Sequence, residues 1–262
     1  DTDRSRGLGD VYKRQNLTWP EAKEAVEEMP VCLLPLGAIE AHGPHMKLDV
    51  DNHICEEQCR RVCAETGIIL MPTIPVGQVW SLNRFPGTLT LSYHTLIAVI
   101  KDLLYSFRKR GFELVFIHSH HYGNVPAVKQ AVRECYDEFR DMKMVILEER
   151  QSMRDKAKEV CTSPFAHPVF WHACEVETSQ ALECCSDRVY MERAICDYPK
   201  FPEDFDSTPT YWDEVTSTGV MGDAKAGTKE KGKVLTEAEV NAMVRLVTYE
   251  MQKMNLSGGK GK

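Results

Sequence analysis

The chain has 262 residues, of which 43% are hydrophobic and 27% are charged, a composition ordinary for a globular protein. This length is sufficient for one large α/β domain with a sizeable core. The formal net charge of -7 argues against a nucleic-acid-binding protein, because phosphate recognition needs a basic surface. No apolar run approaches the roughly 20 residues that span a membrane. We therefore expect neither nucleic acid nor a membrane as partner.

The two ends of the chain do not resemble its middle. The opening "DTDRSRGLGDVYKRQ" is similar to a translated sequencing adapter, and it lacks the apolar core of a signal peptide. We interpret residues 1–15 as a non-native leader, residues 16–255 as one domain, and residues 256–262 as a flexible tail. The ten cysteines lie mostly in apolar segments and form no CxxC pair. This pattern favours reduced thiols in a cytoplasmic protein over disulfides or a cysteine-rich zinc site.

Strands and helices alternate along the first 150 residues. In "LTWPEAKEAVEEMP" Thr18 can cap a helix, Pro20 suits its first turn and Pro30 ends it. Apolar runs predict strands, and amphipathic patterns ending in glycine or basic residues predict helices. The expected strands are 31–37, 68–77, 112–119 and 143–149, and the further helices are 52–67, 92–111, 124–142, 175–187 and 236–254. We expect long ordered loops over residues 200–233. The alternation predicts an α/β fold, a mostly parallel sheet with helices on both faces.

Ligands of such sheets bind beyond the carboxyl ends of the strands, where three polar clusters fall. The first is "GAIEAHGPHMKLDVDNH", residues 37–53, with Glu40 and His42 two positions apart. Carboxylates with imidazoles and no thiolate suit Zn, Mn or Fe(II) in a catalytic role. Gly43 and Pro44 would turn the chain so that a later aspartate returns to the same point. The alternative is a polar loop with hydrogen-bonded histidines.

The second cluster is "HSHHYGN", residues 118–124, at the end of a predicted strand. Strand geometry places His118 and His120 on one face, and Ser119 and His121 on the other. Periodicity does not say which histidine reaches a site, and any one of them could instead be a core residue bonded to the backbone.

The third cluster is "WHACEVETS", residues 171–179. His172 precedes a predicted helix, and Glu175 and Glu177 lie in or near its first turn. The alternative is a helix N-terminus enriched in acids because the helix dipole favours them. Three clusters on separate strand ends nevertheless supply ligands, a proton carrier in His172 and an apolar wall in Trp171, which together predict a hydrolase site.

These clusters resemble motifs of the creatininase (creatinine amidohydrolase) family. "PLGAIEAHGPHMKLDVD" (35–51), "FPGT" (85–88), "SHHYGN" (119–124), "HACEVETS" (172–179) and "TGVMGDAKAGTKEKGK" (218–233) are similar to family elements. The resemblance covers about residues 17–250. It implies a three-layer α/β/α sandwich, a binuclear metal centre and assembly as a homohexamer.

The resemblance also assigns roles within the clusters. It matches Glu40, Asp51 and His121 to one ion, and His42 with bridging Asp51 to the second. It thereby selects His121 over His120 and Asp51 over Asp49. Creatininase proper has a glutamate two residues after the His121 position, where this sequence has Gly123. Our candidates to replace it are Glu177 and, as the alternative, Glu175.

The remaining expected roles are catalysis and substrate binding. His172 matches a family histidine of proton transfer, and His172 and Glu175 are the candidate catalytic residues. His45 is expected behind the ligands, and Asp49 and His53 at the surface. Trp171, Tyr122 and Trp80 are candidates to contact a small-molecule substrate.

The implied reaction is hydrolysis of a cyclic amide or related C–N bond, with two divalent ions (Zn, Mn or Fe) that lower the pKa of water. Relatives also act on formamidopyrimidines, peptides and ring ketones such as dehydro-inososes, whose C–C bond breaks. The ring-ketone reaction is the second expectation. A non-catalytic metal-binding subunit on the same fold is the alternative from a different class.

Overall fold

The computed structural model describes residues 13–148 and 150–256. The helices are α1 (Trp19–Glu28), α2 (Val50–Thr66), α3 (Tyr93–Lys109), α4 (Val125–Tyr136), α5 (Arg150–Val160), α6 (Glu175–Cys184) and α7 (Lys229–Lys253). The strands are β1 (Val31–Leu36), β2 (Ile69–Leu70), β3 (Leu114–Ser119), β4 (Lys143–Ile146), β5 (Cys196–Asp197) and β6 (Gly222–Asp223). Most of the predicted leader, residues 1–12, and most of the predicted tail lie outside the described residues. Lys13, within the predicted leader, forms an ion pair with Glu56 of α2.

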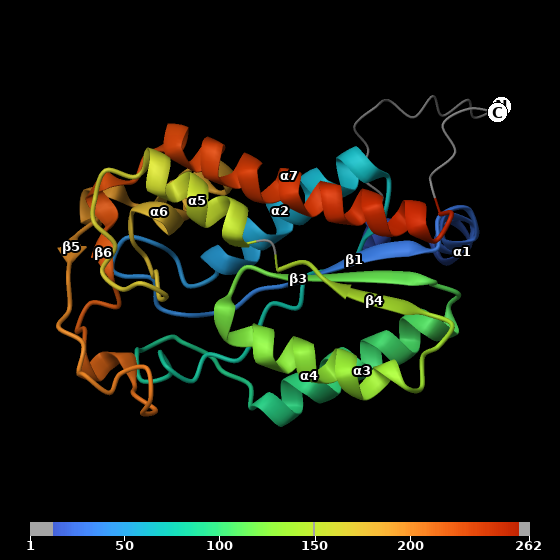
Figure 1. Cartoon of the computed structure of the whole chain (residues 1–262), viewed down its shortest axis with the longest axis horizontal. Coiled ribbons are helices and arrows are strands. Elements are labelled where there is room, and N and C mark those ends of the chain that lie inside the picture. Colours follow the sequence, from blue (N-terminus) through green and yellow to red (C-terminus); the bar gives the residue numbers. More distant parts are fainter. Residues whose placement is uncertain (1–12, 149, 257–262) are drawn as a thin grey trace.

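The central sheet has the order β2-β1-β3-β4, and all its strand pairs are parallel. Figure 1 shows α2 and α7 along one face and α3 and α4 along the other, which gives three layers. This confirms the predicted α/β/α sandwich. A separate antiparallel pair, β5 and β6, lies at one end of the molecule.

The side chains of β1 alternate between two cores, because successive residues of a strand face opposite sides. Cys32, Leu34 and Leu36 pack with α1, α3 and α4. Val31 and Leu33 pack with α2 and α7. All six residues of β1 are buried, as expected for an inner strand of a parallel sheet.

Several predicted boundaries are confirmed by local contacts. Thr18 forms a capping box with Glu21 at the start of α1. α2 ends before Gly67, which adopts a φ of 76° and caps the helix in the left-handed region.

Several expectations differ from the structure. The helix expected over 124–142 ends at Tyr136, and the strand expected over 143–149 ends at Ile146. The strand predicted over 68–77 is only Ile69–Leu70, because prolines 72 and 75 cannot donate to a ladder. α2 begins at Val50 rather than at 52, and α7 begins at Lys229 rather than at 236, so the predicted loop of 200–233 ends in a helix. α5 was not predicted, because its sequence is polar and it buries only Met153 and Ala157.

The described cysteines, which include all ten of the chain, are free thiols. Among the helices of the described residues, none has the length and apolar character to cross a bilayer.

Candidate metal centre and active site

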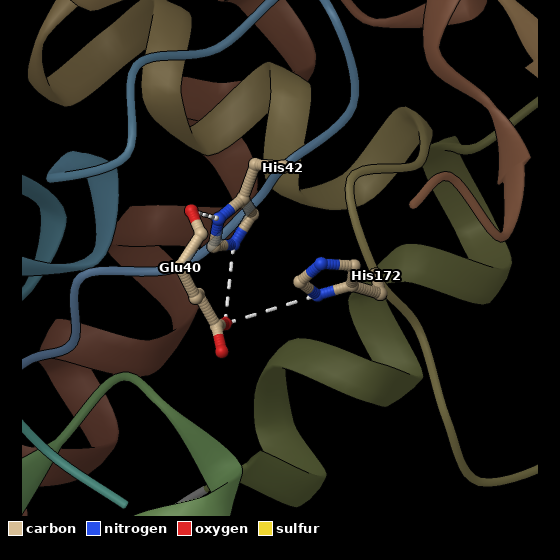
Figure 2. Close-up of side chains that lie close together, drawn as sticks. All are labelled: Glu40, His42 and His172. Carbon is tan, nitrogen blue, oxygen red and sulfur yellow. Dashed lines mark hydrogen bonds and ion pairs between the residues drawn. The ribbon is translucent and has the colours of Figure 1, made fainter. Parts of the chain in front are cut away.

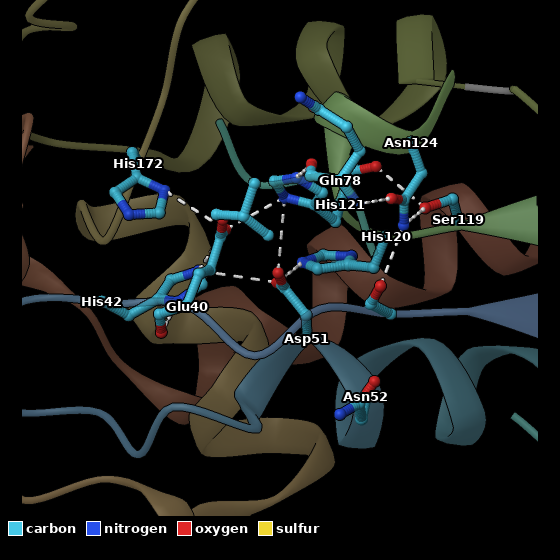
Figure 3. A network of polar contacts seen from close by, with 12 residues as sticks. Glu40, His42, Asp51, Asn52, Gln78, Ser119, His120, His121, Asn124 and His172 are labelled. Carbon is cyan, nitrogen blue, oxygen red and sulfur yellow. Dashed lines mark hydrogen bonds and ion pairs between the residues drawn. The ribbon is translucent and has the colours of Figure 1, made fainter. Parts of the chain in front are cut away.

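The site forms where β1 and β3 end side by side. Leu36 and Ser119, their last residues, are paired in the sheet. The segments that follow these strands carry Glu40 and His42 on one side and His120 and His121 on the other. α2 adds Asp51 in its first turn, and the segment before α6 adds His172. Figure 3 shows that the three sequence clusters converge on one point.

The chain between Glu40 and Asp51 folds back on itself. Gly43 has a φ of 63°, and His42 forms a bridge with Met46 across the turn that follows. The returning chain then accepts a hydrogen bond at the Leu48 carbonyl from the Glu40 amide, at 2.9 Å. This turn delivers Asp51 beside Glu40, as the glycine and proline had suggested.

Glu40, Asp51 and His121 form one compact group. His121 Nδ1 lies 3.0 Å from Glu40 Oε1 and 3.6 Å from Asp51 Oδ2. The other ring nitrogen, Nε2, lies 2.8 Å from the Gln78 carbonyl and donates to it in the tautomer with its proton there. That tautomer leaves the Nδ1 lone pair directed at the two carboxylates, as in histidines that bind metals.

His42 and His172 repeat this arrangement around the same Glu40 (Figure 2). His42 Nδ1 lies 3.3 Å from the Glu40 carbonyl, and its Nε2 lies 3.6 Å from Glu40 Oε1 and 3.5 Å from Asp51 Oδ1. His172 Nε2 lies 2.7 Å from the Ala41 carbonyl, and its Nδ1 lies 4.0 Å from Glu40 Oε1. Each ring thus has one nitrogen at a backbone carbonyl and one facing the carboxylates.

The electrostatics of this cluster favour a bound cation. Burial raises the pKa of both Glu40 and Asp51 well above their usual range and lowers the pKa of His42 and His121. Glu40 Oε2 and Asp51 Oδ2 are buried and accept no hydrogen bond within the described part of the chain. Clustered carboxylates and neutral imidazoles are costly to bury alone, and a divalent cation would offset that cost. These residues therefore fit a metal centre, and two overlapping groups lie close enough to hold an ion: Glu40, His42 and His172, and Glu40, Asp51 and His121.

The structure separates the two glutamates of the third cluster. Glu177 Oε2 lies 3.9 Å from His42 Nε2 and 3.8 Å from His172 Nδ1, at the site. Burial and the Asp51 carboxylate raise the pKa of Glu177 to about 8. Glu175 instead accepts hydrogen bonds from the Thr162 and Ser163 amides and pairs with Lys231 at 2.5 Å. The structure does not bring Glu175 to the cluster, because residues two apart on a helix point in nearly opposite directions.

The other polar residues of the first cluster surround the site or lie apart from it. His45 is buried, and its Nε2 lies 2.9 Å from Thr178 Oγ1 behind the cluster. Asp49 and His53 form a partly exposed pair at 3.1 Å on the first turn of α2. These placements match the expectations for the three residues.

A cavity of about 840 Å³ opens over Glu40, Asp51 and His121. Trp80, Tyr122 and Trp171 all line it. Trp80 stacks on Tyr211 at a ring distance of 4.2 Å, and Trp171 stacks on Phe165 at 4.3 Å, so both indoles are fixed. The three expected substrate-contacting residues thus share one cavity with Glu40, Asp51 and His121.

Two further residues at the site, Gln78 and Arg150, were missed in the sequence, and a third, His120, was considered there but not selected. Gln78 contributes its carbonyl to His121, which no side-chain pattern reveals. Arg150, at the start of α5, donates from Nη2 to the carbonyls of Ser119 and His120, at 2.8 and 2.9 Å. His120 is buried with its Nε2 3.9 Å from Asp51 Oδ1, although the family motif selects its neighbour.

Comparisons with known proteins agree with this site. The family model described as creatinine amidohydrolase matches residues 15–247. The creatinine amidohydrolase of Pseudomonas putida is 28% identical, over 89% of this chain and 95% of that protein. The mycofactocin precursor peptide peptidase of Mycobacterium tuberculosis is 29% identical, over 85% of this chain and 86% of that protein. The 3-dehydro-scyllo-inosose hydrolase of Thermotoga maritima is 24% identical, over 91% of this chain and 83% of that protein.

Solved structures show the same similarity. A creatininase variant of Zn–Zn type superposes with a TM-score of 0.81 and 27% identity, over 92% of this chain and 98% of that one. A manganese creatininase superposes with a TM-score of 0.78 and 27% identity, over 92% of this chain and 99% of that one. The sequence motifs, the three-layer fold and the match over residues 15–247 agree, and this chain belongs to the creatininase family.

Proposed function

We propose that this protein is a metal-dependent hydrolase that opens a cyclic amide or a related C–N bond. The single observation that carries the proposal is the position of the His121 and His42 rings. Each has one nitrogen at a backbone carbonyl and the other facing the shared carboxylates of Glu40 and Asp51. A buried constellation of this kind at the floor of an aromatic cavity is typical of catalytic metal sites.

The proposed centre has two divalent ions, with Zn, Mn or Fe as candidates. Glu40, Asp51 and His121 would hold one ion, and His42, Asp51 and Glu177 the other. Asp51 suits a bridging role because its two oxygens face different histidines: Oδ2 faces His121 and Oδ1 faces His42. When bound, divalent ions lower the pKa of water to about 7 and polarise a substrate carbonyl.

His172 is the proposed proton carrier. Burial lowers its pKa to about 4, even though its contact with the Ala41 carbonyl acts in the opposite direction. The ring is therefore neutral near pH 7, with Nδ1 directed into the site and able to accept a proton. It could then deliver this proton to the leaving nitrogen. Glu177 Oε2 lies 3.8 Å from the Nδ1 of this ring.

The cavity indicates a small molecule as substrate. Its volume of about 840 Å³ lies within the usual range for small-molecule sites. Trp80, Trp171 and Tyr122 offer flat apolar surfaces against which a ring could stack. We propose these three side chains as substrate contacts. From the family resemblance we also propose that the chain assembles as a homohexamer.

A second candidate is hydrolysis of a ring ketone with cleavage of a C–C bond. It is favoured by the Thermotoga maritima relative, which is named as a dehydro-inosose hydrolase. The same site would serve this reaction. The metal ligands would be unchanged, and His172 could protonate a carbon leaving group as well as a nitrogen.

The test is a hydrolysis screen of the metal-loaded protein. The panel includes creatinine, small lactams, formamidopyrimidines, short peptides and inososes, with the Asp51→Ala variant as control. Turnover of a cyclic amide that this variant lacks supports the proposal. Turnover of an inosose alone would select the second candidate. Two bound ions per chain support the enzyme, whereas a chain that binds no metal and hydrolyses nothing would instead be the non-catalytic subunit.

A further inference from the structure

His120 differs from the other histidines around the metal centre. Its side chain is buried, with a relative exposure of 7%, and neither ring nitrogen has a hydrogen-bond partner among the described residues. A buried imidazole without partners is costly, because both its donor and its acceptor lose their bonds to water. In the nearby His118, by contrast, both ring nitrogens have hydrogen-bond partners, the Leu147 carbonyl and the Gln58 side chain.

The ring of His120 is directed at Asp51 (Figure 3). Its Nε2 lies 3.9 Å from Asp51 Oδ1, the same oxygen that lies 3.5 Å from His42 Nε2. The other oxygen of Asp51, Oδ2, lies 3.6 Å from His121 Nδ1. The carboxylate of Asp51 thus has one histidine beside Oδ2 and two beside Oδ1.

The backbone around His120 fixes this direction. Arg150 donates to the carbonyls of Ser119 and His120 and so holds the segment after β3. No side chain can enter from Gly123, because a Cβ there would lie 2.4 Å from His121 Nε2 and 2.5 Å from the Gln78 carbonyl oxygen. Among residues 119–124, His120 is therefore the side chain that faces the Oδ1 side of Asp51.

We propose that His120 binds the second metal ion through Nε2, as a further ligand beside His42, Asp51 Oδ1 and Glu177. Imidazoles and carboxylates together are a ligand set used by Zn and by Fe(II), and the bound cation would give Nε2 of this ring a partner. Nδ1 of His120 would then carry the proton. The assignment rests on the proposed function, because it requires the two-ion centre.

The test compares matched glutamine substitutions of two neighbouring histidines. Wild type, His120→Gln and His118→Gln are stripped with a chelator and titrated with Zn²⁺ in a calorimeter, and bound zinc per chain is measured after dialysis. We expect two ions for wild type and His118→Gln. We expect His120→Gln to keep the first ion and to bind the second at least about 100-fold more weakly.

A cobalt titration of the same proteins provides a readout independent of activity. The visible absorption of the second Co²⁺ should change in His120→Gln and stay unchanged in His118→Gln. His120→Ala serves as a second variant, with the same expectation, if the glutamine side chain disturbs folding. Circular dichroism checks the fold of each protein.

Two results would overturn the assignment, and they differ. If His120→Gln binds both ions with wild-type affinity, His120 is not a ligand, while the proposed function stands. If wild type itself binds fewer than two ions, the two-ion centre fails, and the assignment fails with it.

Discussion

His121 and Glu40 meet across the carboxyl edge of the sheet, with His121 Nδ1 3.0 Å from Glu40 Oε1. They come from segments that follow two paired strands, and both are buried. Burial raises the pKa of Glu40 and lowers that of His121, so it disfavours the charged form of each group. A bound cation would offset the free-energy cost of burying the ionised carboxylate.

Replacing Asp51 by alanine should remove bound metal and activity together. Asp51 lies between the proposed ions and has contacts with His42 and His121. Metal per chain and turnover are measured on the same preparation. Asp49→Ala, two positions earlier in a partly exposed pair with His53, is the control and should keep both. Full turnover in Asp51→Ala would contradict the two-ion centre.

Replacing His172 by alanine should keep metal and lose turnover. Its proposed role is proton transfer, which contributes about 10²–10⁴-fold to a rate. We expect kcat to fall by about that factor while bound metal per chain stays at the wild-type value. His53→Ala, which removes a partly exposed histidine, is the control. If His172→Ala instead releases an ion, His172 is a ligand rather than a proton carrier.

Replacing Gly123 by alanine should weaken metal binding. The new Cβ would collide with His121 Nε2 and with the Gln78 carbonyl, so the bond that orients His121 would break. Loss of such an orienting contact typically costs about 10–100-fold in metal affinity. Gly67→Ala is the matched control, since Gly67 has a φ of 76° and nothing within 4 Å. That control should lose about 1 kcal/mol of unfolding free energy and bind metal as wild type does.

Replacing Glu175 by glutamine should reduce stability without loss of metal. Burial raises the pKa of Glu175, but bonds from Lys231, Ser163 and Thr162 outweigh it and bring the pKa to about 2. Because the pKa of Glu175 is lower in the folded chain than in the unfolded chain, its ionised form stabilises the fold at pH values above the unfolded pKa of 4.5. This stabilisation is lost as the pH falls towards about 2. We expect glutamine to cost about 2 kcal/mol at pH 7.

Urea unfolding at pH 7 and at pH 3 measures this contribution. Wild type should lose more stability between the two pH values than Glu175→Gln does. Glu237→Gln, in an exposed pair with Lys233, should stay within about 0.5 kcal/mol of wild type. Loss of bound metal in Glu175→Gln would contradict the placement of this residue away from the site.

The sequence predicted most of the strands and helices that position the site. The capping residue Thr18, the apolar run of β1 and the terminal Gly67 are local signals, and the structure confirms each. α5 was not predicted, because a helix that buries few side chains has a weak apolar pattern. This helix brings Arg150 to the site.

Within the site, the sequence offered alternative residues for the same role, and the three-dimensional arrangement is needed to distinguish them. Glu175 and Glu177 share one helical turn, and helical geometry sends one to Lys231 and the other to His42. Alternation along β3 could not rank His120 against His121, because the chain leaves the strand at Ser119 and the alternation ends there. Both rings therefore reach Asp51.

The most direct test of the central claim is turnover measured against bound metal. The stripped protein receives Zn²⁺ or Mn²⁺ in steps, and hydrolysis of the best substrate from the screen is followed at each step. We predict no turnover in the metal-free chain and a rate that reaches its maximum at two ions per chain. Undiminished turnover in a chain shown to be metal-free would contradict the account.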